Sequence, residues 1–388
     1  MALGLALLVV LVPELTLAPV VGLEGDPASG HRAVPPRVGL RVADSLLGLS
    51  AHHATRPPRP QDIDTAAFAS AIEAARAAAE AYGLTAAIAS GSELVWSGAA
   101  GVRRDGATPL AADDALVIGS VTKTFIAATV LQLAQERSIS LSDSLTKYVP
   151  DAPIDDAVTI HQLLDHSSGL ADVFNDTTKR ALEEHPERGW TSEQVMGALH
   201  APWYDPGEDW AYANTNYLLL GLLIEKVTNQ PLDDVLASRF TGPLDLDETR
   251  LISATEPGEA LAPAWATIFW ASGAMVASAE DLATWGDALY SGDLLRPYMQ
   301  RQMLRLNGND YGLGVQRLVL GDLTGYGHTG LLNTYTTLLV HLPADDVTIA
   351  LLVNRSDVDL AAVLAARPPN GASLIDLALG RPLRLAAD

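Results

Sequence analysis

The chain has 388 residues, of which 48% are hydrophobic, and this is enough to build one large domain, or two closely packed ones, around a buried core. Its 25 basic and 47 acidic residues give a formal net charge of −22, which argues against nucleic acid or an anionic lipid surface as a partner. The absence of cysteine excludes disulfides, thiolate zinc sites and cysteine nucleophiles.

Residues 1–12 are an apolar run that Pro13 and Glu14 end, and the first 23 residues, with one charge among them, form a candidate signal or anchor segment. Their length fits either role, although no lysine or arginine precedes the apolar run. Residues 24–61 are rich in proline, arginine, glycine and histidine, which is typical of a linker. We therefore expect a secreted or cell-envelope protein without stable membrane insertion beyond that segment, and a folded domain over residues 62–388.

Hydrophobic periodicity and turn residues predict the elements of this domain. The expected helices lie at 65–82, 117–136, 357–366 and 373–379, with further helices through most of 155–263. The expected strands lie at 84–89, 93–99, 311–318, 334–342 and 347–353. Strands at both ends with helices between them indicate one α/β (α+β) domain, in which a mainly helical subdomain of about residues 155–263 is inserted.

Two S-x-x-K sequences occur, and they begin at Ser120 and Ser144. Residues three apart on a helix share a face, so the amine of Lys123 can reach the hydroxyl of Ser120. That pair opens a strongly apolar helix, where burial would lower the lysine pKa and yield a neutral amine able to take the serine proton. The pair Ser144 and Lys147 lies in a polar stretch, which favours an exposed turn capped by the serine. A capping serine with a lysine reaching solvent is the alternative for either pair.

Two later segments carry further candidate residues. Tyr212 and Asn214 stand two apart before an apolar helix, so that both can point into one cleft; a buried aromatic and a helix cap are the alternative. His328, Thr329 and Gly330 precede an expected strand. A histidine there can hold positive charge, and the glycine would let a substrate lie close to the strand backbone, although an ordinary hairpin would have the same sequence.

In this order, the three segments resemble the S-x-x-K, Y-x-N and (K/H)-T-G motifs of serine penicillin-binding proteins and class C β-lactamases. Further segments similar to that superfamily are 117–125, 163–170, 206–207, 212–217, 278–282 and 311–314. The resemblance covers about residues 65–379, and its motifs are nearest to D-Ala-D-Ala carboxypeptidases and to D-aminopeptidase or esterase relatives. It implies a β-lactamase/transpeptidase-like catalytic domain over residues 62–388, with an antiparallel sheet flanked by helices.

The resemblance also implies a role for each residue of the first two motifs. Ser120 would attack an acyl carbonyl, and Lys123 would act as the base. Tyr212 would carry a proton to the leaving group. Asn214 would orient both Lys123 and the substrate amide. No metal and no cofactor is implied.

The third motif is expected to bind substrate. His328 would support Tyr212 and supply positive potential, and Thr329 and Gly330 would line the substrate's path. The oxyanion hole would combine two backbone N–H groups, those of the nucleophilic serine and of Leu331.

Two positions depart from the pattern of the superfamily. The carboxypeptidase-like relatives carry an arginine after the Y-G-L-G segment that grips a terminal carboxylate, but here Gln316 stands at that place. Arg317 follows it, and neighbours on a strand face opposite sides. Loss of the clamp predicts a preference for neutral leaving groups, with Gln316 among the substrate-binding residues. The glycine common four residues after the H-T-G glycine is replaced by Thr334.

These observations predict an acyl-serine hydrolase that cleaves ester or amide bonds of the D-amino-acid peptide type in a small-molecule or peptide substrate. Two alternatives use the same residues and stay open: a D-Ala-D-Ala carboxypeptidase or weak β-lactamase, and a penicillin-binding protein that is acylated with little turnover. The motifs do not separate these, because acylation is common to all of them. They say nothing of the oligomeric state.

Overall fold

The computed structural model describes residues 63–252 and 261–381. The candidate signal or anchor segment at 1–23 and the linker at 24–61 fall outside these ranges. Within the two described ranges, no helix is both long and apolar enough to cross a membrane.

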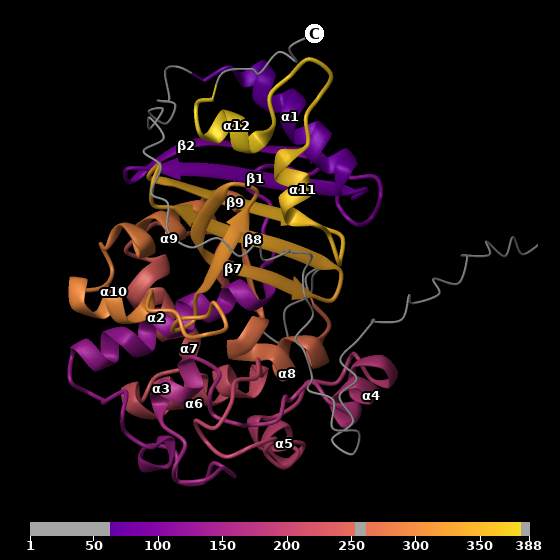
Figure 1. Cartoon of the computed structure of the whole chain (residues 1–388). Helices are drawn as coiled ribbons and strands as arrows, with labels where there is room; N and C mark the ends of the chain where they lie inside the picture. The colour runs from indigo at the N-terminus through magenta and orange to yellow at the C-terminus, as the bar shows by residue number, and fades with distance from the viewer. Residues whose placement is uncertain (1–62, 253–260, 382–388) are drawn as a thin grey trace, which may run out of the picture. The chain divides into compact units, whose positions relative to one another are not determined.

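A six-stranded antiparallel sheet of order β2-β1-β9-β8-β7-β6 joins the two ends of the described chain (Figure 1). Its strands are β1 Gly83–Ser90, β2 Glu93–Gly101, β6 Gln316–Leu320, β7 Leu323–Leu332, β8 Tyr335–Leu342 and β9 Val347–Val353. The register of β1 on β9 places Leu84 opposite Val353. The predicted antiparallel sheet built from both ends of the domain is therefore confirmed.

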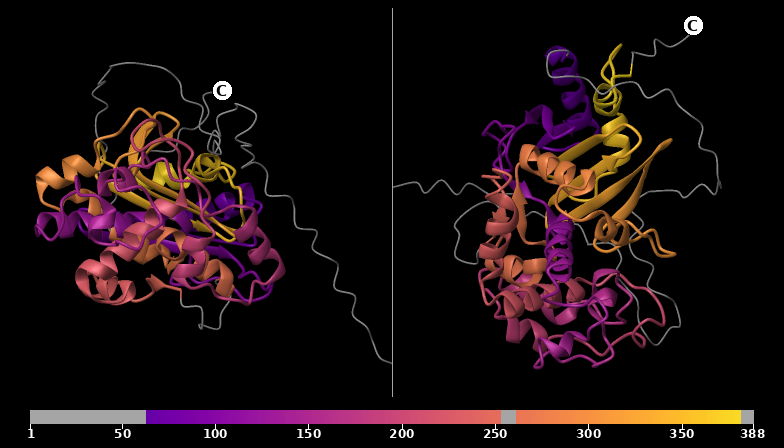
Figure 2. Two further views of the ribbon diagram at one scale, coloured as in Figure 1. Left: turned by 90° about the horizontal axis from the view of Figure 1, so that it is seen from below. Right: turned by 90° about the vertical axis from the view of Figure 1, so that its left-hand side faces the viewer.

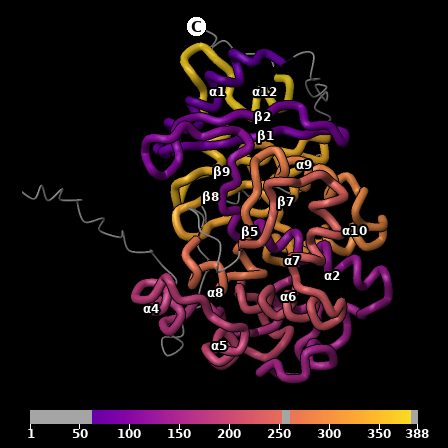
Figure 3. The backbone as a smooth tube through the Cα atoms, turned by 180° about the vertical axis from the view of Figure 1, so that it is seen from behind, coloured from indigo at the N-terminus to yellow at the C-terminus, as the bar shows by residue number. Residues whose placement is uncertain are grey.

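Both faces of this sheet are covered, and the helices that pack on it are α1 Thr65–Ala78, α9 Ala279–Ser291, α11 Leu360–Ala365 and α12 Leu374–Ala378. Alternate residues of β8 enter different hydrophobic clusters: Leu338 and Val340 pack with α1, α11 and α12, whereas Leu339 packs on the side of α9. This alternation follows from the two-residue period of a strand. The sheet therefore lies between α9 on one side and α1, α11 and α12 on the other, and Figure 3 shows α9 apart from α1 and α12.

The remaining helices build the region that lies beside the sheet in Figure 2. They are η2 Gly119–Val121, α2 Thr122–Gln135, η3 Leu145–Lys147, α3 Ile160–Leu164, α4 Asp176–Glu184, α5 Ser192–Gly197, α6 Asn214–Thr228, α7 Leu232–Leu236, the π-helical turn η4 Ala237–Thr241, α8 Pro263–Gly273 and α10 Pro297–Met303. A second small sheet has the order β3-β5-β4, with β3 Leu116–Val117, β5 Met275–Ala277 and β4 Arg250–Leu251.

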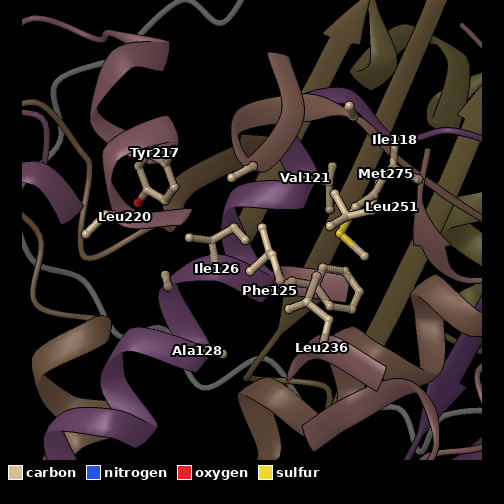
Figure 4. Close-up of a cluster of buried hydrophobic side chains, with 14 of the residues drawn as sticks. Ile118, Val121, Phe125, Ile126, Ala128, Tyr217, Leu220, Leu236, Leu251 and Met275 are labelled. Atoms are coloured by element: carbon tan, nitrogen blue, oxygen red, sulfur yellow. The ribbon is translucent and has the colours of Figure 1, made fainter. Parts of the chain in front are cut away.

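Helix α2 runs through the centre of this region and is buried on nearly all sides. A helix that is apolar all round is stable only inside a core, and α2 meets that condition by packing against α6 and α8. Phe125 stacks on Trp285 with ring centroids 3.8 Å apart. Figure 4 shows Phe125 and Ile126 of α2 among the apolar side chains of this core, with Tyr217 of α6 nearby. The core therefore holds the start of α2 in a fixed position.

Two details of the predicted elements differ in the structure. The strand expected at 311–318 begins only at Gln316, because Gly314 adopts φ +74° and turns the chain. A methyl group on Gly314 would lie 2.4 Å from the Cβ of Ala127, so this turn packs tightly on α2. His328, Thr329 and Gly330 precede the expected strand, which is β8, but they also lie within a strand of their own, β7, which pairs with β8.

Candidate active site

Ser120 and Lys123 lie at the point where η2 passes into α2. The 3₁₀ turn holds Ser120, and Lys123 is the second residue of α2. Lys123 Nζ donates a hydrogen bond to Ser120 Oγ over 3.0 Å. The structure therefore brings together the first S-x-x-K pair as its spacing predicts.

Lys123 is fully buried and has three hydrogen-bond acceptors. Besides Ser120, they are Asn214 Oδ1 at 2.9 Å and the carbonyl oxygen of Ser272 at 2.7 Å. Burial lowers the pKa of Lys123 to about 7, and the negative charge of Asp172 opposes that shift. Near neutral pH the amine is therefore present in both forms, and the neutral form can accept the proton of the serine.

The second S-x-x-K pair has a different environment. Ser144 caps η3 by accepting from the Thr146 N–H, as expected for an exposed turn. The Lys147 side chain is 57% exposed and forms an ion pair with Asp143 at 2.9 Å. Because this lysine is exposed and ion-paired, it stays protonated and cannot accept a proton from Ser144.

Tyr212 completes the group around the serine. Burial raises the pKa of the tyrosine above its usual value, and the interaction of its hydroxyl with the Ser120 side chain opposes that shift. The ammonium of Lys123 lies 4.9 Å from the centroid of the Tyr212 ring. Because the phenol keeps its proton, Tyr212 is placed to donate that proton, while Lys123 is the group able to take one.

Asn214 begins α6, and Asp172 fixes its side chain. The carboxylate of Asp172 accepts the Asn214 backbone N–H at 3.0 Å and its Nδ2 at 3.2 Å. With Nδ2 held in this way, Oδ1 is the atom left to face Lys123. The sequence interpretation did not identify Asp172. The available signal was an acidic residue just beyond the matched segment 163–170, in a loop that otherwise supplies site residues.

The environment of His328 differs from the one expected. Its Nε2 is paired with the hydroxyl of Tyr311 at 3.0 Å and its Nδ1 with the carbonyl oxygen of Thr329 at 2.6 Å. Burial, reinforced by the charge of Lys123, lowers the pKa of His328 to about 3. The expectation that His328 supplies positive potential is therefore wrong. Both ring nitrogens of His328 are thus bound to Tyr311 and to Thr329, so its support of Tyr212 is not a direct hydrogen bond.

The backbones of η2 and β7 approach each other closely at two glycines. A methyl group on Gly330 would lie 2.0 Å from the carbonyl oxygen of Ile118, and one on Gly119 would lie 2.9 Å from the Leu331 nitrogen. Gly119 also has φ +52°, which favours glycine. The absence of side chains at these positions places the backbone of Leu331 beside that of Ser120, as an oxyanion hole made of these two N–H groups requires.

Gln316 and Thr329 lie side by side on β6 and β7. Gln316 Oε1 accepts from the Thr329 backbone N–H at 3.0 Å and from its hydroxyl at 3.1 Å. Arg317 points elsewhere, because Asp310 holds its guanidinium through bonds of 2.8 to 3.0 Å. The two neighbouring side chains therefore have separate hydrogen-bond partners. Thr334, the other departure, lies in the turn between β7 and β8.

No cluster of three metal-binding side chains occurs in the part of the chain that the structure describes. The site is built instead from a serine, a lysine, a tyrosine and backbone groups. This combination can move a proton from a hydroxyl, form a bond from its oxygen, and protonate a departing atom.

Comparisons with known proteins show the family to which this architecture belongs. The family model described as Beta-lactamase matches residues 68–367. Protein flp of Staphylococcus aureus strain MW2 is 34% identical over 139 residues, which are 34% of this chain and 27% of flp. Penicillin-binding protein 4* of Bacillus subtilis strain 168 is 28% identical over 149 residues, which are 37% of this chain and 32% of that protein. Each match thus spans less than a third of the curated relative.

A solved structure gives a longer match. The crystal structure of a D-stereospecific amidohydrolase from Streptomyces sp. superposes with a TM-score of 0.65 and 29% identity. The superposition covers 77% of this chain and 98% of the amidohydrolase. With the family match, this likeness supports hydrolase activity for a chain of this architecture. The chain belongs to the β-lactamase family, within the superfamily of serine β-lactamases and penicillin-binding proteins.

Proposed function

We propose that this protein is a serine hydrolase that cleaves ester or amide bonds of the D-amino-acid type through an acyl-enzyme on Ser120. The observation that carries the proposal is the fully buried Lys123, whose Nζ lies 3.0 Å from Ser120 Oγ and whose pKa burial lowers to about 7. Burial of an amine costs stability, so a lysine in this state is unusual for a purely structural residue and typical of a functional site.

In acylation, neutral Lys123 takes the proton of Ser120 as Oγ attacks the acyl carbonyl carbon. The oxygen that gains charge is bound by the N–H groups of Ser120 and Leu331, and such fixed donors each contribute about 3 kcal/mol to transition-state stabilisation. Tyr212 gives its proton to the leaving nitrogen or oxygen and regains one from protonated Lys123. Water then attacks the ester on Ser120, the same groups pass its proton to Oγ, and the acid product leaves.

The polar groups around the site favour a substrate that is neutral next to the scissile bond. Both donors of Thr329 are used on Gln316, and Arg317 is held by Asp310. His328 carries no charge at neutral pH, since its pKa is lowered to about 3. A terminal carboxylate in this position would lack the charge-assisted bidentate partner that gives such groups their strong binding. The D-stereospecific amidohydrolase among the similar structures supports an amide of a D-amino acid as the substrate.

A second candidate is a D-Ala-D-Ala carboxypeptidase, a weak β-lactamase or a slowly deacylating penicillin-binding protein, and the similarity to penicillin-binding protein 4* favours keeping it. Purified protein would be assayed with D- and L-amino-acid amides, p-nitrophenyl esters, acyl-D-Ala-D-Ala and nitrocefin, each with the Ser120→Ala variant as control. We expect turnover of the D-amides and esters that depends on Ser120. Faster cleavage of acyl-D-Ala-D-Ala than of a matched ester would reject the proposal in favour of the second candidate. A penicillin label that persists after a chase would do the same.

A further inference from the structure

A chain of buried hydrogen bonds runs beneath the catalytic tyrosine. Ser168 Oγ donates to Asn216 Oδ1 at 2.6 Å, and Asn216 Nδ2 lies 2.9 Å from His166 Nδ1. His166 Nε2 lies 3.2 Å from the hydroxyl of Tyr311, which in turn lies 3.0 Å from His328 Nε2. All five side chains are at most 2% exposed. The chain connects the loop at 166–168, α6, the turn before β6, and β7.

The groups at the two ends of this hydrogen-bond chain determine which ring nitrogen of each histidine carries the proton. The backbone N–H of Ala213 points at His166 Nδ1 over 3.3 Å, and an N–H can only donate, so His166 Nδ1 is an acceptor. Neutral His166 therefore carries its hydrogen on Nε2 and donates it to Tyr311. At the other end, His328 Nδ1 faces the carbonyl oxygen of Thr329, which can only accept. His328 therefore carries its hydrogen on Nδ1, and its Nε2 accepts from Tyr311.

The hydroxyl of Tyr311 is the one group that fits between these two rings. It accepts from His166 and donates to His328, and a hydroxyl can do both at once. A second proton on His166 would point at two donors, and a second proton on His328 would remove the acceptor of the tyrosine hydrogen. The other titratable groups that face the two rings are Lys123, Tyr212 and Tyr217, of which the lysine opposes further positive charge.

This chain of hydrogen bonds contacts the proposed catalytic residues at two places. The ring of His166 packs on that of Tyr212 with centroids 4.3 Å apart. At the other end, His328 holds the carbonyl of Thr329, whose N–H and hydroxyl are bound by Gln316. The ring of His166 thus packs against Tyr212, the proposed proton donor. The ring of His328 belongs to β7, the strand on which the substrate is expected to lie.

We propose that Tyr311 is a positioning residue, whose hydroxyl holds His166 and His328 each in one neutral tautomer. The two rings thereby keep Tyr212 and strand β7 in the positions that acylation requires. The kinetic part of this inference rests on the proposed function, whereas the tautomers do not. The protein would then run its reaction without a titrating histidine, although two histidines lie within the site.

The tautomers are measured on the wild-type protein by ¹⁵N NMR of the imidazoles, with signals assigned from single His→Gln variants. We expect His166 protonated at Nε2 and His328 protonated at Nδ1, with no titration from about pH 5 to about pH 8. Any other tautomer, or titration of either ring in that range, overturns the inference. This measurement needs neither a substrate nor a variant of Tyr311, so it stands even if no acyl donor reacts.

The positioning role is tested with Tyr311→Phe. The matched control is Tyr290→Phe, since the hydroxyl of Tyr290 is also buried but has no hydrogen-bond partner among the described residues. We expect Tyr311→Phe to lower the acylation rate by about ten- to a hundredfold, with a further loss towards acid pH as His328 becomes able to titrate. The Tyr290 variant should keep the wild-type rate and pH profile. Equal rates and profiles in the two variants would reject the positioning role, whereas an unreactive wild type with the expected tautomers would reject only the proposed function.

Discussion

Asp172 and Lys123 are connected through the amide of Asn214, which donates to the carboxylate and accepts from the ammonium. The amide therefore has one orientation, and the two opposite charges are kept apart by a single side chain. The negative charge acts on the lysine across this bridge, since it raises a pKa that burial lowers. The pKa of the proposed base, Lys123, thus depends on a carboxylate that does not contact the reacting atoms.

The first prediction concerns this carboxylate. Asp172→Asn removes the charge and places a second amide against that of Asn214, so the acid limb of the kcat/KM profile should move to lower pH while the maximum falls. The direction follows because Asp172 raises the pKa of Lys123. Asp176→Asn, an exposed aspartate on α4, is the control and should leave the profile unchanged. An unshifted acid limb in the Asp172 variant would show that the carboxylate has no electrostatic effect on the base.

The second prediction concerns Lys123 itself. Because its pKa is lowered to about 7, the neutral amine is lost as the pH falls below that value, and kcat/KM should rise with pH through about 7 to a plateau. Arginine keeps its charge, so Lys123→Arg should fail as badly as Lys123→Ala, each by about a hundred- to ten-thousandfold. Stopped-flow acylation across pH measures both effects. Near-native kcat in the arginine variant would mean that the lysine acts through its charge.

The lowered pKa of Lys123 also makes the free energy of unfolding depend on pH. Between pH 7 and the ordinary lysine range the unfolded chain holds a proton at Lys123 that the folded protein has released. More protons bound in the unfolded state mean that stability rises with pH, so the contribution of Lys123 to the free energy of unfolding should increase across this window. The difference between wild type and Lys123→Met in urea denaturation, measured at several pH values, tests the sign.

The third prediction separates the two S-x-x-K serines. Ser120→Ala should abolish covalent labelling by fluorophosphonates and β-lactams, whereas Ser144→Ala should label like the wild type. The reason is the contrast between a buried lysine beside Ser120 and an exposed, ion-paired Lys147 beside Ser144. Mass spectrometry of the labelled peptide identifies the serine. An adduct on Ser144 would contradict the assignment of the nucleophile.

The fourth prediction concerns the leaving group. Gln316→Arg should shift kcat/KM towards acyl-D-Ala-D-Ala and away from neutral esters by about 1–3 kcal/mol, the typical contribution of a charged hydrogen bond. Arg317→Ala should leave this preference unchanged, because Asp310 already holds the guanidinium. Competition assays with paired substrates measure the ratio directly. If the wild type prefers the carboxylate substrate and Arg317→Ala destroys that preference, the placement of Gln316 rather than Arg317 beside the leaving group is wrong.

The fifth prediction concerns the approach of β7 to η2. In Gly330→Ala the new methyl group would lie 2.0 Å from the carbonyl oxygen of Ile118, so the strand must move away from Ser120. We expect a loss of about 1–3 kcal/mol in the free energy of unfolding, together with slower acylation. Gly197→Ala meets nothing within 4 Å and serves as the control. Unchanged acylation in Gly330→Ala would show that Leu331 need not lie close to Ser120.

The sequence predicted those parts of the site that depend on local spacing. Lys123 reaches Ser120 because residues three apart share a helical face, and the long apolar run after them could only be a buried helix. The β1–β2 hairpin followed from alternating apolar residues around a Ser-Gly-Ser turn. These features are encoded in neighbouring residues, so no tertiary information was needed to find them.

Features that depend on distant segments could not be read in this way. The carbonyl of Ser272 reaches Lys123 because α8 is interrupted at Trp270, where φ is 20° and ψ is −112°. Asp172 meets Asn214 across 42 residues of chain. A positive charge was expected on His328 from the resemblance to the superfamily. The partner that completes its environment, Tyr311, comes from a turn that had been predicted as a strand.

The pairing of β1 with β9 affects the order in which the domain can fold during its synthesis. Leu84 leaves the ribosome long before Val353, its partner in the sheet, so the central strand contact spans almost the whole domain. Contacts this distant in sequence form late and slow the folding of a chain. Until β9 emerges, β1 presents an unpaired edge, and β7 has no completed sheet to hold it against Ser120. The proposed nucleophile, Ser120, is therefore synthesised early, whereas the strand proposed to supply the second oxyanion donor is fixed in the sheet only after β9 has been synthesised.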